Sequence, residues 1–571
     1  MKKLGLQSII QLLFLLGILL LINILGNSRW GNTPLYGMLD LTEEKRFTLT
    51  QGSKNLLREL DDVVTVEILL DGDLPANYKR LKEAIQQTLD DFRSESAYIE
   101  YFFTDPSAGD PETVQQFQDE LAKQGVYPVV ERLQKADEMS AKLIYPYAKF
   151  YYKGRPAAVN FLANQVPGMP EDLVLENSIG LLEYQMANII QKLRTPTRKN
   201  VAFLAGHGEL NSLETADLEK SFGAFYNTGR LFLDSIVQVD PQISAIIVAK
   251  PRAAFSEKDK FKLDQYVMRG GKMLWLLDAM RVDLDSLRDG RDYIATDYQL
   301  NLDNLLFTYG IKIQANLVLD LSCTSIPLAT GRLGNAAQFE DIPYWYHPVI
   351  IPTSSHPIVK ALNPINLFYP SSIDTTSRTK TDIQRSVLLT SSDRSRLQFN
   401  PVRMNFDIFQ TDVPEEKFNK GPQVVAMALE GVFPSLYENR VTESMLSGLA
   451  SLDMEFKTQS PPNRMLVVAD GDIAKNNVNY EKGQYAPLGF NEFVKYQFAN
   501  KDFLINALEY LLDQNDILEA RGKEVKLRLL NETKAQAERS YWQLVNIVFP
   551  LLFIAIFGLL FTWMRKRKYS R

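Results

Sequence analysis

Two long apolar segments, one near each end of the chain, constrain its fold most strongly. Residues Leu4 to Leu25 and Leu544 to Met564 contain no charged side chain. At about 1.5 Å per residue, each segment is long enough to cross a hydrocarbon core of about 30 Å as a helix. We therefore expect one transmembrane helix at 4–25, another at 544–564, and a folded body between them.

Basic residues set the expected orientation of both segments. Lys2 and Lys3 precede the first, and a run of four basic residues, 565–568, follows the second. The positive-inside rule then places both termini in the cytoplasm and the body on the other side of the membrane. A cleavable signal peptide is the alternative for the first segment. Its apolar region usually spans about 7–15 residues and ends in small residues, and 24–28 is a poor cleavage site.

Composition excludes several classes of protein. The net charge is −6, and no basic stripe appears outside the two ends, so we expect no nucleic-acid partner. The single cysteine, Cys323, excludes an intrachain disulfide and a multi-cysteine metal site. The sequence has only three histidines, and a zinc site would require all of them to converge. We therefore expect no metal and no cofactor.

The segment 45–165 predicts a small α/β domain. Apolar runs at 63–70, 98–103, 129–134, 142–152 and 157–162 are typical of strands, and Lys153-Gly154-Arg155 is a hairpin turn. Helices are expected at 77–93 and 111–123. This β-α-β-α-β-β order resembles a thioredoxin-like fold. No Cys-x-x-Cys motif is present, so redox chemistry is excluded and scaffolding or recognition remains.

A connecting helix is expected at 171–194. Its apolar residues follow alternating steps of four and three, the spacing of a helix–helix seam: Leu175, Ile179, Leu182, Met186, Ile189 and Leu193. The seam predicts packing against neighbouring domains of the same chain. A partner helix or a homodimer contact is the alternative, because so few heptads do not require a coiled coil.

The segment 199–515 predicts a second α/β domain with a parallel sheet. Short apolar runs at 201–205, 245–249 and 273–277, the first closed by Gly and the third by Asp, alternate with helical patterns and give a β-α-β order. Further strands are expected at 424–429 and 465–469, and an amphipathic helix at 501–513. Repeated prolines predict a loop-rich insertion around 322–420, in which only 387–390 resembles a strand. A charged stalk, 516–543, then leads to the second membrane segment.

Five residues that follow predicted strands are candidates for a ligand or partner site. His207 and Glu209 lie in the turn after strand 201–205, Asp278 follows the third strand, and Asp470 and Asp472 follow 465–469. Ligands of open α/β sheets usually bind at the carboxyl ends of the strands. Hydrogen bonds within the turn are the simpler role for His207, and aspartate after a strand is often only a turn residue. The chain has no P-loop, G-x-S-x-G or H-E-x-x-H motif, so no catalytic residue is assigned.

Several longer stretches carry a resemblance to a known family. They are V-A-F-L-A-G-H-G-E at 201–209, F-S-E-K-D-K-F-K-L-D-Q-Y-V-M-R-G-G-K-M-L-W-L-L-D at 255–278, A-D-G-D at 469–472 and N-K-D-F-L-I-N-A-L-E-Y-L-L-D at 500–513. With both apolar ends, the chain resembles the GldG family, the gliding-motility-associated auxiliary subunits of Bacteroidetes ABC transporters. The resemblance implies a middle domain similar to one in an intraflagellar-transport protein. That domain is related to flavodoxin- and class I glutamine amidotransferase-like folds, without their catalytic apparatus.

The resemblance also implies partners and a location. It predicts a non-enzymatic subunit of the bacterial inner membrane with a periplasmic body, an ABC permease partner and a separate cytoplasmic ATPase, acting in gliding motility or associated secretion. Two alternatives stay open. The chain could be an envelope hydrolase or amidotransferase that uses His207 and Glu209, or a purely structural envelope scaffold.

Overall fold

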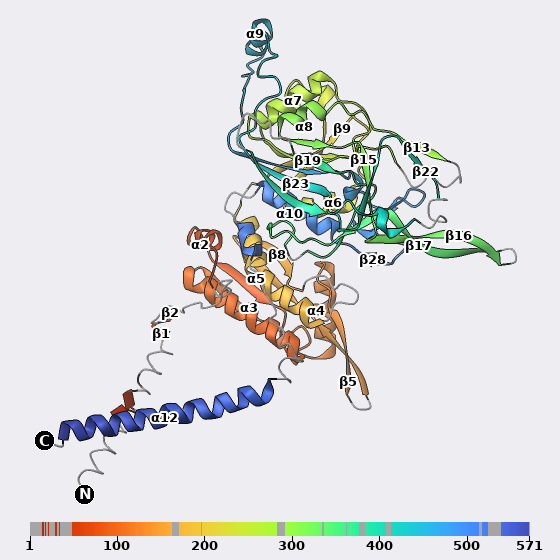
Figure 1. Cartoon of the computed structure of the whole chain (residues 1–571). Coiled ribbons are helices and arrows are strands. Elements are labelled where there is room, and N and C mark those ends of the chain that lie inside the picture. Colours follow the sequence, from red (N-terminus) through yellow and green to blue (C-terminus); the bar gives the residue numbers. More distant parts are fainter. Residues whose placement is uncertain are drawn as a thin grey trace. The chain divides into compact units, whose positions relative to one another are not determined.

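The computed structural model forms two compact units, residues 1–523 and 524–571, which are described separately (Figure 1). Apart from a few positions before residue 48, the structure describes 48–135, 138–162, 171–195, 197–282, 292–333, 336–360, 362–375, 383–406, 413–512, 517–522 and 538–569. The predicted first membrane segment, 4–25, lies almost entirely outside the described residues. After that segment, two short strands, β1 (Arg29–Trp30) and β2 (Thr33–Pro34), pair antiparallel.

The N-terminal region is a four-stranded sheet covered by helices. The sheet order is β4 (Ile99–Phe103), β3 (Val64–Ile68), β7 (Tyr147–Tyr152) and β8 (Arg155–Asn160). β3 and β4 are parallel, whereas β7 pairs antiparallel with both β3 and β8. The helices are α2 (Gln51–Arg58), α3 (Ala76–Glu95) and α4 (Pro111–Lys123). In α3 the buried residues recur every three or four positions, which is the pattern that predicted this helix: Tyr78, Leu81, Ile85, Leu89 and Phe92.

One predicted strand in this region is wrong. The run at 142–152 is two strands, because β6 (Glu138–Ile144) ends before Tyr145-Pro146 and β7 begins at Tyr147. Pro146 has no N–H to continue a ladder. β6 instead forms a hairpin with β5 (Val129–Lys135), separate from the four-stranded sheet.

The connecting helix forms as predicted and is packed inside its own chain. α5 (Glu171–Arg194) contacts α2, α3, β7 and β8. Five of the six seam residues are buried, with Met186 completely inaccessible, and only Ile179 is partly exposed. The seam therefore serves the interior of this chain.

A mixed seven-stranded sheet forms the centre of the second region (Figure 1). Its order is β10 (Asn227–Phe232), β9 (Asn200–Ala205), β11 (Ile243–Ala249), β12 (Lys272–Leu276), β24 (Asn463–Val468), β23 (Val424–Gly431) and β20 (Ile383–Thr390). The first five strands are parallel, as predicted for this domain, and β23 pairs antiparallel with both of its neighbours.

Helices cover both faces of this sheet. On β9, Val201 and Phe203 pack with α6 (Ala216–Gly223) and α10 (Asn500–Leu512), in a core continuous with α5. The alternate residues Ala202 and Leu204 pack on the other side with α7 (Glu257–Met268) and α8 (Asp303–Thr308). A strand buried on both faces reads as a continuous apolar run, which explains why these strands were predictable.

The prediction of a loop-rich insertion around 322–420 is wrong, because more than half of the described residues of this segment lie in strands. The antiparallel pair β16 (Cys323–Leu333) and β17 (Ala336–Ile350) is the longest hairpin described. Shorter strands accompany it: β13 (Tyr293–Ala295), β14 (Ile311–Ile313), β15 (Asn316–Asp320), β18 (Ile365–Asn366), β19 (Ile373–Thr375), β21 (Ser395–Phe399) and β22 (Val402–Met404). Residues of β13, β15, β16, β17 and β22 form a separate core, which contains Tyr344, Tyr346 and Tyr369.

The end of the chain corrects part of the predicted stalk. Residues Ile517–Gly522 form a 3-10 helix, η6, that packs against α2 and α5. There Arg521 is buried and donates to the side-chain oxygen of Asn506 at 2.6 Å. The rest of the stalk up to residue 537 lies outside the described residues.

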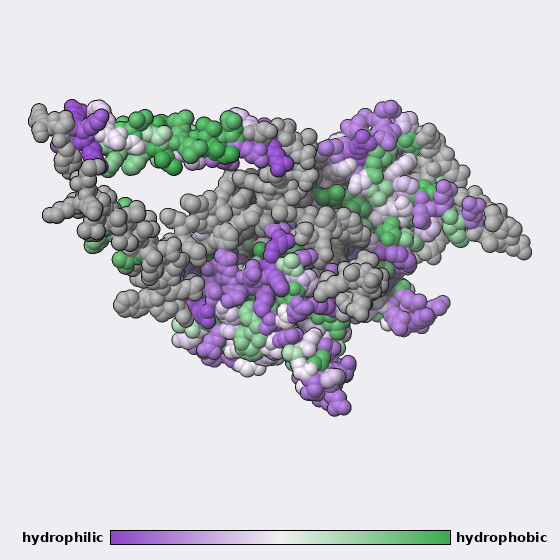
Figure 2. All heavy atoms as spheres, turned by 90° about the horizontal axis from the view of Figure 1, so that it is seen from below, coloured by the Kyte–Doolittle hydropathy of each residue, from purple (hydrophilic) through white to green (hydrophobic). Residues whose placement is uncertain are grey.

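The predicted second membrane segment lies within α12 (Arg539–Tyr569). This is the one helix in the described part of the chain that is long and apolar enough to cross a membrane, over Tyr541–Lys568. Figure 2 shows hydrophobic residues along the middle of this helix and hydrophilic ones toward its ends.

Candidate functional site

The five residues singled out from the sequence lie at one edge of the seven-stranded sheet. His207 and Glu209 follow β9, Asp278 follows β12, and Asp470 and Asp472 follow β24. Because these strands are parallel, their carboxyl ends share one edge. The side chains fall into two groups with different partners.

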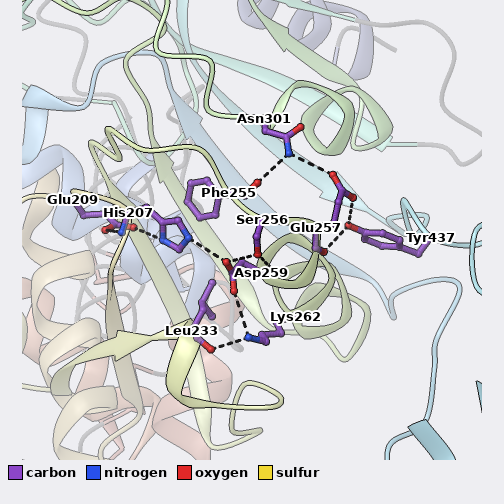
Figure 3. Close-up of polar contacts among 10 residues, drawn as sticks. All are labelled: His207, Glu209, Leu233, Phe255, Ser256, Glu257, Asp259, Lys262, Asn301 and Tyr437. Atoms are coloured by element: carbon purple, nitrogen blue, oxygen red, sulfur yellow. Dashed lines mark hydrogen bonds and ion pairs between the residues drawn. The ribbon is translucent and has the colours of Figure 1, made fainter. Parts of the chain in front are cut away.

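The first group surrounds the imidazole of His207 (Figure 3). Its Nε2 lies 3.4 Å from an Asp259 carboxylate oxygen, within hydrogen-bond distance. Its Nδ1 lies 3.3 Å from Glu209 Oε1, which is close enough for an ion pair but lacks the geometry of a hydrogen bond. The ring stacks on Phe255 at 4.0 Å. Glu209 also accepts a hydrogen bond from the His207 backbone N–H at 2.7 Å. His207 is thus held on three sides, and its side chain is only 10% exposed.

The turn that carries His207 requires its glycines. Gly206 and Gly208 have φ of +120° and +76°, values that other residues adopt with strain. The His207 carbonyl accepts hydrogen bonds from the backbone N–H groups of Arg252 and Ala253, both at 2.8 Å. These bonds tie the turn after β9 to the loop after β11.

The charges around His207 favour its protonated form. Burial alone would lower the pKa of His207, but the carboxylates of Glu209 and Asp259 outweigh burial and raise the pKa. Ser256 Oγ donates to Asp259 at 2.6 Å, which places the aspartate between serine and histidine. In a hydrolytic triad the histidine lies between the other two and accepts the serine proton. The arrangement here has the wrong order for that transfer.

The second group is a buried lysine among three aspartates. Lys250, which follows β11, lies with its Nζ 3.0 Å from Asp278 Oδ2 and in contact with Asp472 Oδ2. Its side chain is 3% exposed. Asp470 accepts backbone hydrogen bonds from Phe368 at 2.7 Å and from Asp472 at 2.8 Å. The group therefore connects three neighbouring strand ends to the β18–β19 segment.

The pKa values in this group depend on one another, because one cation, Lys250, lies among three carboxyl groups. Burial would lower the pKa of Lys250, but Asp278 and Asp472 raise it well above its usual value. The ammonium in turn outweighs burial at Asp472 and lowers the pKa of that carboxyl. Burial and the neighbouring carboxylates raise the pKa of Asp470 far above its usual value, and burial also raises that of Asp278.

The three aspartates could be considered as ligands for a metal ion. Their carboxylate oxygens lie within 4.8 Å of one another. The Lys250 ammonium already contacts two of them and supplies the positive charge that a divalent ion would bring. These residues therefore do not fit a resident metal.

Sequence reasoning missed Lys250 and Asp259, although each had a signal. Lys250 follows a buried strand in the same way as the aspartates, and a search for every polar residue at a strand end would have included it. Asp259 lies in the first turn of α7, where its N–H donates to the capping Ser256 hydroxyl. Its second contact, with His207, spans 52 positions of the chain.

The remaining chemically active side chains lie elsewhere. His347 is surrounded by aromatic rings and His356 stacks edge-on against Tyr510 at 5.0 Å. Among the described residues, no histidine belongs to a group able to hold a metal. Burial raises the pKa of the Cys323 thiol to about 12, so this cysteine is not an activated nucleophile.

Comparison with known proteins places the chain in a family. Residues 198–507 match the family described as "ABC-type uncharacterized transport system", and residues 43–151 match a family described as "Domain of unknown function". An uncharacterized protein of Borreliella burgdorferi is 21% identical over 437 residues, which cover 74% of this chain and 79% of that protein. The solved structure of the mmIFT52 N-terminal domain is 10% identical in sequence to this chain. The match covers 55% of this chain and 97% of that domain, with a TM-score of 0.30. That score is too low to carry an argument. The first match spans 310 of 571 residues (198 to 507), so the chain belongs to the ABC-type uncharacterized transport system family of ABC transporter auxiliary proteins.

Proposed function

We propose that this chain is a non-catalytic, membrane-anchored subunit that joins an ABC permease and a separate cytoplasmic ATPase. The observation that carries the proposal is the family match over 198–507, in a chain that ends in the apolar helix α12. In the proposed topology, 4–25 is a second anchor, both termini are cytoplasmic, and the body lies in the periplasm of a bacterial inner membrane. The basic residues at both ends support this orientation.

The division of labour follows from what single helices can do. One or two isolated helices cannot enclose a polar path through lipid, so transport requires a multi-spanning partner. The sequence contains no P-loop, so nucleotide hydrolysis through that fold requires another subunit. We further propose that the complex is the gliding-motility type, GldG, because the quoted stretches at 201–209 and 255–278 resemble that family.

The domain types belong to the same proposal. The strand order β4-β3-β7-β8, with only β3 and β4 parallel, agrees with a thioredoxin-like domain at 45–165. A parallel sheet covered on both faces agrees with a flavodoxin- or amidotransferase-like domain at 199–515. The missing Cys-x-x-Cys motif and the order serine–aspartate–histidine support a role in recognition for both.

The contacts of the five candidate residues support a non-catalytic role. His207 is enclosed by two carboxylates and a phenyl ring, and Asp278 and Asp470 are buried with internal partners. We propose that these residues fix the edge of a docking surface and that Asp472, the most exposed of the three aspartates, lies nearest to a bound partner or solute. His207→Gln, which keeps a polar side chain, should then retain the function of the complex, whereas the hydrolase alternative requires its loss.

Isolation of the native complex tests the proposal. The full chain, tagged and solubilised from its own membranes in mild detergent, should recover a multi-spanning permease and a P-loop ATPase. A second tagged ABC permease from the same membranes is the control for detergent conditions. Recovery of the chain alone, while that control keeps its own ATPase, would count against the proposal.

A further inference from the structure

The segment 438–455 projects from the second region as an arm that carries a short helix, α9 (Glu443–Ser451). The arm lies in the chain between β23 and β24, two neighbouring strands of the seven-stranded sheet. Figure 1 shows α9 at the end of this arm, apart from α7 and α8. No residue of α9 is buried, so the helix covers none of its side chains with the described part of the chain.

Both ends of the arm are fixed to α7. The ring of Phe261 contacts Tyr437 before the arm at 5.2 Å and Phe456 after it at 6.2 Å. Gln265 exchanges two hydrogen bonds with the backbone of Lys457, at 2.9 and 3.0 Å. These contacts fix the base of the arm, so the projection of α9 begins from a defined place on the second region.

The sequence of the arm specifies a helix at both ends. The Thr442 hydroxyl accepts a hydrogen bond from the backbone N–H of Met445 at 3.3 Å, which makes Thr442 the N-cap. At the other end Asp453 has a φ of +56°, and the Met454 N–H donates to the Leu449 carbonyl at 2.9 Å, as in helices that end with a left-handed residue. Isolated helices shorter than about 12–15 residues are marginal in water, because packing supplies most helical stability in proteins. α9 therefore needs a surface that the described chain does not provide.

One side of α9 is a stripe of large apolar side chains. Met445, Leu449 and Leu452 follow the spacing i, i+4 and i+7, which places them on one face of the helix. Met445 and Leu452 are 58% and 59% exposed. Ser447 lies on the opposite side of the helix. Helices that bind in grooves of other proteins use this spacing for their anchor residues.

The charges of the arm indicate what kind of surface covers this stripe. The arm has a net charge of −3, from four acidic residues and one basic residue: Glu438, Glu443, Asp453, Glu455 and Arg440. Within the described part of the chain, Glu443, Asp453 and Glu455 have no ion-pair partner. A second copy of the arm would repel it, and helices that lie on anionic lipid are rich in lysine and arginine. A protein groove with basic residues at its rim has the complementary charge.

We propose that α9 is a docking helix, whose stripe of Met445, Leu449 and Leu452 binds in an apolar groove of another protein with lysine or arginine at the rim. The inference goes beyond the proposed function, because it assigns a docking element to one segment and does not require an ABC permease as its occupant. Failure to recover a permease would leave it unaffected.

Photochemical cross-linking of the full chain in its own membranes tests the proposal. Leu449 is replaced by the photoreactive residue p-benzoylphenylalanine, and the same replacement at Ser447 is the control on the opposite side of the helix. Position 449 should be joined to one protein, at a site where apolar residues lie beside lysine or arginine, and position 447 should give far less product. Products with a second copy of this chain, with lipid only or with no protein would overturn the proposal, and so would equal yields from the two positions.

Affinity measurements with the protein identified in this way, purified by itself, complete the test. Leu449→Asp places a charge in the apolar contact and should weaken binding at least roughly tenfold, whereas Ser447→Asp should stay within about twofold of wild type. Glu443→Lys should also weaken binding, because its new charge would face the basic rim. Since no residue of α9 is buried, these variants should leave urea unfolding of the chain unchanged. Wild-type affinity in Leu449→Asp, an equal loss in Ser447→Asp, or tighter binding in Glu443→Lys would overturn the proposal.

Discussion

Replacement of Lys250 by methionine should destabilise the protein more than any surface change. Lys250 is the one cation in contact with Asp278 and Asp472 in the described structure, and its side chain is 3% exposed. Methionine has a similar length without the charge. The variant would leave Asp278 buried without a contacting cation and Asp472 with only the more distant Lys475, and Asp470 lies beside them.

The magnitude follows from distance and burial. At 3.0 Å and an effective dielectric constant near 20, one ammonium–carboxylate pair is worth about 5 kcal/mol of Coulomb energy. Desolvation of the ammonium offsets part of this energy, so the net cost of removing one member of a buried pair is about 3–5 kcal/mol. Lys475→Met is the matched control, because Lys475 lies 3.9 Å from the same Asp472 and is 33% exposed. It should cost less than about 1 kcal/mol.

Urea unfolding of the full chain in detergent, followed by tryptophan fluorescence, measures this cost. Trp275 is completely buried in β12, next to β11, whose carboxyl end carries Lys250. The double variant Lys250→Met/Asp472→Asn should recover part of the lost stability, because it removes one of the stranded charges. Equal midpoints for Lys250→Met and wild type, or no recovery in the double variant, would refute the reasoning.

The same variant should change the pH dependence of stability. Without the ammonium, buried carboxyls have pKa values above their unfolded value of about 3.9, so the folded state binds more protons than the unfolded state. Stability then falls as pH rises through that interval, and the deficit of Lys250→Met should be smaller at pH 5 than at pH 8. In the wild type the lowered pKa of Asp472 acts in the opposite direction. Its contribution is present above the unfolded pKa and is lost as pH falls through the folded pKa.

Two further predictions concern the same sheet edge. Because the folded-state pKa of His207 is raised, protonated His207 stabilises the fold below the unfolded pKa near 6.5, and this contribution is lost as pH rises through the folded pKa. Glu209→Gln should lower the pKa of His207, which histidine NMR titration measures. An unchanged titration would contradict the assigned ion pair. Gly471→Ala should destabilise by about 1–3 kcal/mol, because an added Cβ would lie 2.6 Å from Lys250 Cβ, whereas Gly229→Ala, which meets nothing within 4 Å, should cost far less in the same urea assay.

The parallel part of the second sheet was predictable because each strand is buried on both faces. Apolar runs such as 201–205 and 273–277 end at a glycine or aspartate, and helical patterns separate them. The carboxyl edge follows from that topology, so the strand-end positions of His207, Asp278 and Asp472 were accessible from the sequence. β10 was missed because it contains no continuous apolar run, and its polar residues Asn227, Thr228 and Arg230 fall on both faces.

The prediction for the segment 322–420 was wrong because of how its prolines were interpreted. Prolines were treated as strand breakers, yet Pro343 and Pro348 lie within β17 and Pro327 within β16. Proline is tolerated where its missing N–H does not face a partner strand, as on an edge. β17 pairs with β16 along most of its length and with β18 only at Val349 and Ile350, so much of its second edge carries no ladder.

The chemistry of the site was harder to predict from the sequence than its position. Three aspartates at neighbouring strand ends suggest a crevice that binds something positive, and in the structure that cation is Lys250 of the same chain. Which charges neutralise one another depends on contacts across about 220 positions, such as Lys250 with Asp472. Strand-end patterns cannot supply this information, because they indicate at which edge of the sheet a residue lies but not which residue it contacts.

These contacts separate two kinds of polar residue at the same edge. Where a side chain has internal partners, as His207 and Asp278 do, its charge is used within the fold and a ligand would have to replace an existing interaction. His347 is equally buried and has no hydrogen-bond partner for either ring nitrogen, so it carries a desolvation cost within the fold. The fold thus uses the polar groups that it pairs at this edge to hold neighbouring strands, and it bears the cost of the one that it leaves unpaired.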